Sequence, residues 1–522
     1  MSGLKKYAPF IASSLLMYVV LYLIYPNYQY YIDPDGTSYL TISQRYAIGD
    51  YAKAINGYWS PWSCWLTAML IKAGLAAIPA SVIVNSAAAT GYLYIAQSFF
   101  LRFNMQRLMQ WILNLALVVF LCFAIFWQSF ADLWECFFLL STLRLMLADR
   151  FSSKPTLWLV IGFVGALGYF AKAYSFPFFI LNTVVCAYFI VGKNRTPWLK
   201  ICAVSLTTMA VVSLPWIIAL HHKYGIWTTS TAGTLNTSWY LVGHPHWKDG
   251  INLLLPPAYP DSPYYWEDPW FVNGDTPHFW SSWHLFGLQF LRIGLNLWKL
   301  LRSSLELSLF FPVIGVLALL SLRSKKWQAV FAGDIKIVLY SFLLFPLGYV
   351  LINFESRYLW YMLPLALVLG SVVLDKLELK SKKLWMIALA VSLVVFPVWG
   401  LIKIYGVGKE EYEMAQTLKL KGFKGSFSSN ATPGRESQQV ERIAYFAGMQ
   451  YYTIPIQERG VNYLPELKKY GVDYIFVLPG EPKAHPCTLP YQDKSGNPLL
   501  AMELPFRGTN ASQGWKVYVL KR

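Results

Sequence analysis

Long apolar blocks separated by short polar segments run from the N-terminus to about residue 404. An α-helix rises about 1.5 Å per residue, so about 20 apolar residues cross a hydrocarbon core about 30 Å thick. The pattern therefore predicts a polytopic α-helical membrane protein with about eleven transmembrane helices. The predicted spans are residues 7–26, 80–101, 108–126, 132–147, 157–170, 176–191, 198–220, 304–322, 335–352, 358–374 and 384–404.

The apolar stretch at residues 157–191 is too long for one span. A single helix of that length would reach about 50 Å. The stretch also contains Lys172 and Pro177, which favour a break. We therefore predict two short helices joined near Lys172.

Short basic clusters between the apolar blocks predict the orientation, because basic residues in short loops retain those loops in the cytoplasm. With the hairpin in place, all the clusters fall on one side. This predicts a multi-pass protein of the plasma (inner) membrane with a cytoplasmic N-terminus and two long outer loops, residues 27–79 and 221–303. The clusters are Lys5 and Lys6; Arg102 and Arg107; Arg150 and Lys154; Lys193, Arg195 and Lys200; Arg323, Lys325 and Lys326; Lys376, Lys380, Lys382 and Lys383.

The pattern changes after residue 404, where short stretches of helical and strand periodicity alternate. Such alternation with short loops is typical of a small α/β layer structure. We expect two domains, a transmembrane domain at residues 1–404 and an extracytoplasmic α/β domain at residues 405–522.

Composition agrees with lipid as the main solvent of the first domain. Hydrophobic residues make up 56% of the chain and charged residues 14%, whereas soluble domains carry about 25% charged residues. The formal net charge of +17 lies in the short loops rather than on one face, so we expect the lipid bilayer, and no nucleic acid, as a partner. Six cysteines without a Cys-x-x-Cys pair argue against a disulfide framework or a zinc knuckle.

Two carboxylates follow the first span, Asp33 and Asp35. A carboxylate beside a helical bundle can serve as a general base for an acceptor hydroxyl or amine. The alternative is that both residues cap a surface helix at residues 37–48, since Asp favours caps and turns. We prefer the cap for Asp33.

Several motifs follow in a fixed order and together resemble the GT-C superfamily of membrane glycosyltransferases. The similarity is to the bacterial branch that includes aminoarabinose transferases and protein O-mannosyltransferases, and it covers roughly residues 1–400. In three details the chain departs from that branch: Gly36 follows Asp35, no Gly-Pro follows Lys172, and Tyr361 replaces a proline. The motifs are Asp35…Tyr39, Gly49-Asp50-Tyr51, Trp59-Ser60-Pro61-Trp62, Phe130-Ala131-Asp132-Leu133, Phe170-Ala171-Lys172-Ala173 and Asn353-Phe354-Glu355-Ser356-Arg357-Tyr358 with Pro364.

The resemblance implies an inverting hexosyl- or pentosyltransferase. It would move a sugar from a polyprenyl-phosphate donor to an outer-surface lipid, glycan or protein acceptor of the cell envelope. It also implies roles for individual residues. The implied catalytic residues are Asp35, as base, and Asp132; the donor phosphate ligands are Lys172, Arg357 and Tyr358; and supporting residues are Asp33, Tyr39, Glu355 and Arg292.

Three of these cations have ordinary alternatives. Lys172 can be a residue whose amine merely reaches the interface, and Arg357 can simply pair with Glu355. Arg292 shares one helical face with Lys299 and Arg302, a face that suits anionic headgroups as well as a lipid phosphate.

The histidines of the second long outer loop raise the question of a metal. His244 and His246 form a His-x-His pair, which is a weak zinc signal on its own. We expect no required cofactor, with a divalent cation left open. Two other functions stay open as well: a transporter or flippase for a lipid-linked glycan, and a catalytically inactive scaffold of the same fold.

Overall fold

The computed structural model describes residues 5–127, 130–192, 195–243, 254–272, 276–376, 381–431, 434–454, 464–478, 500–504 and 515–520. Its contacts divide the chain into two compact units. We call Met1–Pro26, Ile55–Asn236 and Phe279–Tyr405 the helical unit. We call Asn27–Ala54, Thr237–His278 and Gly406–Arg522 the composite unit, because it is assembled from three separate segments.

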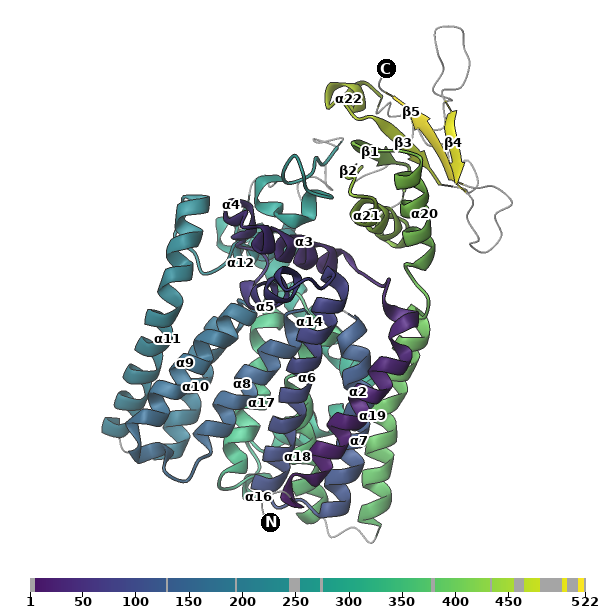
Figure 1. The fold of residues 1–522 in the computed structure, drawn as a ribbon. Helices are drawn as coiled ribbons and strands as arrows, with labels where there is room; N and C mark the ends of the chain where they lie inside the picture. Colours follow the sequence, from purple (N-terminus) through teal and green to yellow (C-terminus); the bar gives the residue numbers. More distant parts are fainter. Residues whose placement is uncertain are drawn as a thin grey trace. The chain divides into compact units, whose positions relative to one another are not determined.

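The helical unit is a bundle of helices with roughly parallel long axes (Figure 1). Its principal helices are α2 (Ala8–Tyr28), α5 (Pro61–Lys72), α6 (Ala77–Arg102), α7 (Arg107–Trp127), α8 (Asp132–Met146), α9 (Pro155–Ala171), α10 (Ser175–Val191), α11 (Arg195–Tyr224), α14 (Trp283–Leu307), α15 (Phe311–Leu320), α16 (Lys325–Val330), α17 (Ile335–Ile352), α18 (Met362–Lys376) and α19 (Lys382–Ile404), with a 3-10 turn η5 (Ser356–Leu359).

Within the described ranges, six helical segments are long and apolar enough to cross a membrane. They are α2, α6, α7, α11, α17 and the segment Lys383–Leu420, which takes in α19 and α20 (Lys409–Leu420). Shorter apolar helices are α9, α10 and α15. Membrane-protein character is therefore clear, whereas the predicted number of about eleven spans is not confirmed.

Two predicted spans show how local sequence decides a helix boundary. The block at residues 157–191 is divided as predicted, because α9 ends at Ala171 and α10 begins at Ser175. The predicted span 304–322 is divided too, which the sequence analysis missed. Ser308 accepts a hydrogen bond from the Phe310 backbone, and a proline stands in the first turn of α15. Proline fits the first turn of a helix but not its interior.

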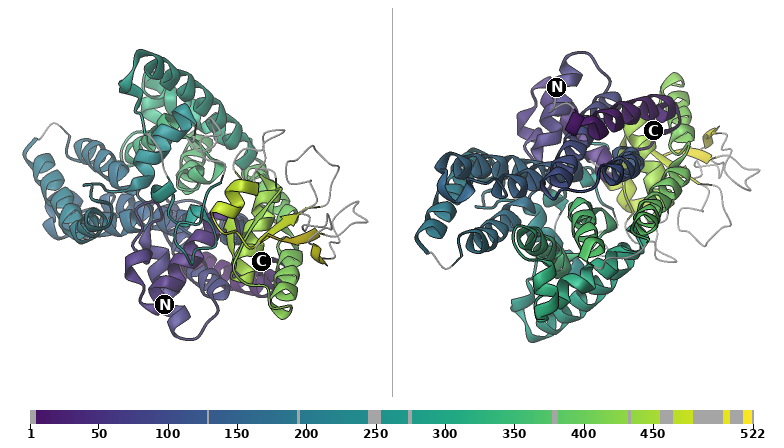
Figure 2. Two further views of the ribbon diagram at one scale, coloured as in Figure 1. Left: turned by 90° about the horizontal axis from the view of Figure 1, so that it is seen from above. Right: turned by 90° about the horizontal axis from the view of Figure 1, so that it is seen from below.

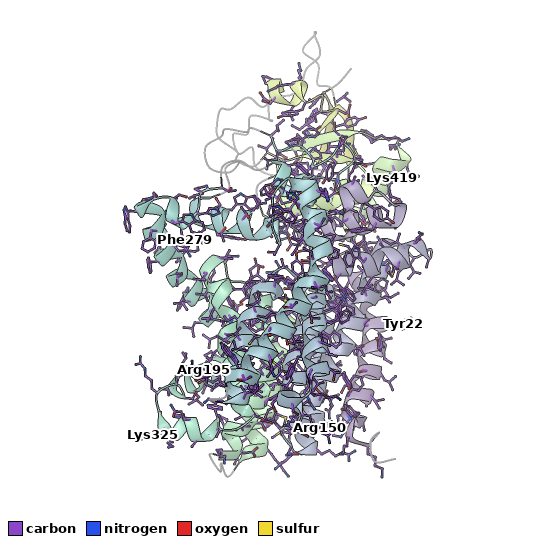
Figure 3. The ribbon with its side chains drawn as sticks, turned by 90° about the vertical axis from the view of Figure 1, so that its left-hand side faces the viewer. Tyr22, Arg150, Arg195, Phe279, Lys325 and Lys419 are labelled. Atoms are coloured by element: carbon purple, nitrogen blue, oxygen red, sulfur yellow. The ribbon has the colours of Figure 1, made fainter. Side chains whose placement is uncertain are left out.

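The helices of the bundle form groups that meet around the site described below. Figure 2 shows the helices of residues 132–224, in blue, on one side of the bundle and those of residues 283–376, in green, on another. Helices α10 and α17 pack against each other where these groups meet. In Figure 3 the labelled residues Arg150, Arg195 and Lys325 all lie toward one end of the bundle, which agrees with the basic clusters sharing one side.

The composite unit contains a five-stranded sheet and several short helices. Its strands are β1 (Ser426–Ser429), β2 (Gln450–Tyr452), β3 (Tyr474–Val477), β4 (Leu500–Leu504) and β5 (Trp515–Val519), in the order β2-β1-β3-β5-β4. Strand β1 is parallel to β2 and β3, whereas β5 is antiparallel to β3 and β4. Its helices and turns are α3 (Pro34–Ile48), α4 (Tyr51–Ala54), η2 (Tyr265–Glu267), η3 (Pro269–Val272), α20, α21 (Arg435–Ala447) and α22 (Leu464–Lys469).

Backbone hydrogen bonds join the segment from the long loop to this sheet. Leu255 and Thr453 form an antiparallel bridge with bonds of 2.8 and 3.1 Å, and the Tyr451 amide donates to the Pro263 carbonyl at 2.7 Å. Residues 27–54 and 237–278 thus group with the C-terminal segment rather than with the helices beside them in sequence. The domain boundary at residue 404 stays a prediction.

Candidate functional site

The break between α9 and α10 places Lys172 among carboxylates of the helical unit. Lys172 is the extended residue that ends α9, and its Nζ lies 2.5 Å from Asp132 Oδ1 and 3.4 Å from Glu135 Oε2. The side chains of Asp132 and Glu135 are 4% and 2% exposed, respectively. Lys172, whose side chain is 18% exposed, is therefore the ion-pair partner of two buried carboxylates as well as a predicted phosphate ligand.

Helix α8 supplies both carboxylates from its first turn. Asp132 is its first residue and Glu135 lies three positions later, so the two share one helical face. Acidic groups are stabilised at a helix N-terminus by the unsatisfied backbone N–H groups and the helix dipole. Tyr349 donates to Glu135 at 3.4 Å, and Ser175 does so at 3.4 Å. Glu135 was not among the residues predicted for the site, although its spacing from Asp132 is a signal for it.

Aromatic rings surround the ammonium group of Lys172. Its Nζ lies 4.3 Å from the centre of the Tyr358 ring and 5.3 Å from that of Tyr349. Those rings are stacked at 3.8 Å, and Tyr174 packs on Tyr349 at 3.8 Å. A Cβ at Gly348 would lie 2.4 Å from the Tyr174 ring. Glycine is required there for the ring to approach the helix.

Arg357 reaches the same carboxylate from another direction. Its Nη1 lies 3.8 Å from Asp132 Oδ2, and its Nε lies 2.9 Å from Glu355. The predicted pairing of Arg357 with Glu355 is present, but it does not exclude contact with the Lys172 group. We define the Lys172 cluster as Lys172, Asp132, Glu135, Arg357, Tyr349 and Tyr358.

The basic face of α14 is connected to this cluster. Lys299 donates to Asn353 Oδ1 at 2.8 Å, and Asn353 donates to Glu355 at 3.2 Å. Arg292, two turns before Lys299, is close enough to act on it electrostatically. The cluster and these neighbours together contain more cations than carboxylates, so their net charge is positive when all are ionised. The cations are Lys172, Arg357, Lys299 and Arg292, and the carboxylates are Asp132, Glu135 and Glu355.

The segment Trp59–Trp65, which contains the Trp59-Ser60-Pro61-Trp62 motif, stabilises the break between α9 and α10. Ser60 accepts a hydrogen bond from the Ala173 amide at 3.1 Å, and Ser63 donates to the Phe130 carbonyl. Trp62 packs edge-on against Trp134 at 5.8 Å. The motif therefore fixes the backbone on both sides of the Lys172–Asp132 pair.

Lys172→Met is expected to destabilise the protein by about 3–5 kcal/mol. The reason is that removing one partner of a buried pair leaves the other charge uncompensated. The double variant with Asp132→Asn should regain part of the lost stability, because it no longer buries the Asp132 carboxylate without its lysine partner. Thermal unfolding of the detergent-solubilised protein measures both effects. Equal stability of Lys172→Met and wild type would contradict the buried pairing.

Asp33 and Asp35 lie at the start of α3 in the composite unit and differ in role. Asp33 is the N-cap of the helix and accepts a hydrogen bond from the Gly36 amide at 2.8 Å, which confirms the cap interpretation. Asp35, in the first helical turn, accepts one from the Trp266 indole at 3.3 Å. Tyr39, on the next turn, is buried. The helix begins at Pro34, three residues earlier than predicted.

Arg45, in the last turn of α3, is the centre of an ion-pair network. Arg45, with a side chain 5% exposed, pairs with Glu267, with Asp261 at 3.1 Å and with Asp50 at 3.3 Å. Lys53 pairs with Asp261 at 2.8 Å. Burial opposes ionisation of Asp261, but hydrogen bonds from Arg45 and Lys53 outweigh it and lower its pKa to about 2. The Gly-Asp-Tyr motif thus serves structure, and nothing in sequence spacing pointed to Arg45.

The predicted histidine-rich loop is tested only in part. His244 and His246 lie outside the described residues. Among the residues that are described, no group of three or more His, Cys, Asp or Glu side chains is arranged to hold a metal ion.

Comparison with known proteins identifies the fold. No family model and no curated protein sequence matches the chain. Two solved structures of ArnT from Cupriavidus metallidurans do match. The one bound to undecaprenyl phosphate has a TM-score of 0.54 and 11% identity, covering 98% of this chain and 97% of that one. The structure of the apo state has a TM-score of 0.54 and 11% identity, and the match covers 100% of this chain and 98% of that one. The chain therefore shares its overall fold with ArnT, which supports the resemblance to the GT-C superfamily that its sequence motifs predicted.

Proposed function

We propose that this protein is a membrane glycosyltransferase. It would transfer a sugar from a polyprenyl-phosphate donor to an acceptor at the outer face of the membrane. The observation that carries the proposal is the convergence of Lys172 and Arg357 on Asp132 from two different helix groups. The net positive charge around them suits an anionic ligand. That ArnT, which shares the fold, was crystallised with undecaprenyl phosphate supports a lipid of this class as the donor.

The chemical step is a single displacement with inversion. The acceptor O–H or N–H bond breaks and its proton passes to the Asp35 carboxylate, while the acceptor atom forms a bond to the anomeric carbon. The bond from that carbon to the phosphate oxygen breaks, and its electron pair leaves with the polyprenyl phosphate. General base catalysis supplies the nucleophile, and Lys172 and Arg357 stabilise the charge that grows on the leaving phosphate.

The test is release of carrier lipid from a synthetic donor. Purified full-length protein is incubated with a panel of polyprenyl-phosphate hexoses and pentoses and an extract of cell-envelope acceptors. We expect free polyprenyl phosphate and glycosylated acceptor in equal amounts. If the protein instead moves intact donor across vesicles without cleaving it, the transferase proposal fails and the transporter takes its place.

The proposal includes an orientation, with the N-terminus cytoplasmic and residues 405–522 on the outer side of a plasma membrane. A phosphatase reporter that is active only outside the cytoplasm is expected to be active when fused after Arg522. The same reporter fused within the basic loop near Arg150 should be inactive. The reverse pattern from two stably expressed fusions would overturn the orientation.

A further inference from the structure

Helix α21 carries a buried acid that neither the sequence motifs nor the proposed mechanism uses. Glu441 is 6% exposed. Among the residues that the structure describes, none offers a hydrogen-bond partner to its Oε2 atom. Leaving a buried polar atom without a partner destabilises a folded protein. Such a group therefore calls for an explanation.

The packing of α21 brings Glu441 to the start of α3. Helix α21 packs against α3 and α20 within the composite unit. The next residue, Arg442, anchors this contact by donating to the Ile32 carbonyl at 3.3 Å and to Glu411 at 2.6 Å. Ile32 directly precedes Asp33. The anchoring cation is thus held by Glu411, and Glu441 is left beside the acidic end of α3.

The charged groups around Glu441 favour its uncharged form. Burial is the largest influence, Arg442 opposes it, and the carboxylates of Asp33 and Asp35 reinforce it, so that the pKa of Glu441 is raised to about 8. Burial raises the pKa of Tyr264, from the long-loop segment, and the charges of Glu441, Asp35 and Asp33 raise it further. Strand β2, which packs on α21 as well, contributes no acidic or basic residue.

We propose that Glu441 is a positioning residue for Asp35: as a neutral acid it adds no charge beside Asp33 and Asp35 and so leaves the Asp35 carboxylate in place. The inference rests on the proposed role of Asp35 as base. Pairs of acids whose surroundings separate their protonation states are a recurring device for dividing acid and base roles. The C-terminal segment thereby takes part in the chemistry of the first loop.

A proton on Glu441 removes its charge without any bound cation. Ionisation of Glu441 would place three like charges together and displace the Asp35 carboxylate from the Trp266 indole. A misplacement of about 1 Å can cost about 100-fold in rate.

The first experiment measures coupling without any activity assay. Thermal unfolding of the full-length protein is followed from about pH 5 to about pH 9 for wild type, Glu441→Gln, Asp35→Asn and the exposed control Glu413→Gln. A carboxyl whose folded-state pKa is raised contributes stability that is present below its ordinary pKa and lost as pH rises through the folded value. Wild type should therefore lose at least about 2 °C of Tm relative to Glu441→Gln toward pH 9. In Asp35→Asn, the loss of Tm with rising pH should be smaller and should be complete at a lower pH. The Tm of Glu413→Gln should equal that of wild type at each pH.

The second experiment measures transfer as a function of pH. Glu441→Gln should keep wild-type activity near pH 7 and retain it near pH 9, where wild type falls by about 10- to 100-fold. Indistinguishable thermal profiles for wild type and Glu441→Gln, or a profile insensitive to Asp35→Asn, would overturn the inference. So would identical pH–activity profiles, or loss of activity in Glu441→Gln at every pH. If wild type transfers no sugar, the proposed function fails, and the thermal coupling alone decides whether Glu441 responds to Asp35.

Discussion

Asp35→Asn is expected to lower sugar transfer by about 100- to 10,000-fold while leaving the protein folded and membrane-inserted. Loss of a general base typically costs this much. Asparagine keeps the size of the side chain and still accepts the hydrogen bond from Trp266, which is 3.3 Å long in the wild type. It cannot take a proton. The measurement is release of polyprenyl phosphate by purified protein, with thermal unfolding as the check on folding.

The matched control is Asp33→Asn, two residues away. Asp33 is the N-cap of α3, and asparagine caps a helix about as well as aspartate. This variant should therefore retain most of the activity. If Asp35→Asn stays within about three-fold of wild type, Asp35 is not the base, and Asp132 becomes the residue to test next.

Arg357→Ala is expected to slow transfer by about 10- to 150-fold and to weaken donor binding. A hydrogen bond to a charged group contributes about 1.5–3 kcal/mol, and 1.4 kcal/mol corresponds to a factor of ten. Arg357→Lys should restore only part of the activity, because lysine lacks the two-pronged donor geometry of the guanidinium. Arg302→Ala is the control, since Arg302 is 72% exposed and pairs with Glu306 on the same helix.

A double substitution at Lys172 and Arg357 tests whether both side chains hold one phosphate. If they do, the double variant should lose less than the sum of the single losses, expressed as free energies. Lys172 also neutralises Asp132 and Glu135, so only variants with a cooperative unfolding transition are compared. Full additivity would separate the two cations and remove Lys172 from the phosphate site.

The helices could be predicted because their signals are local. Apolar blocks of about 20 residues, the charge at Lys172 and the Asp33-Pro34 start of α3 each determine a short stretch of backbone by themselves. The break after Leu307 was missed, although Ser308 and the following proline carry a local signal for it. The GT-C fold followed from the order of several weak motifs, none of which was specific alone.

The surroundings of the candidate residues depend on contacts between distant segments. The sequence by itself predicted Asp35, Asp132, Lys172 and Arg357 as the charged residues of a transferase site. Only the tertiary structure decided that Lys172 is paired with Asp132 and Glu135. It alone placed Glu441 beside the start of α3, because α21 is recruited there by packing rather than by any nearby sequence signal. Burial and pairing are properties of the folded chain, and they decide which of its charges are free to act.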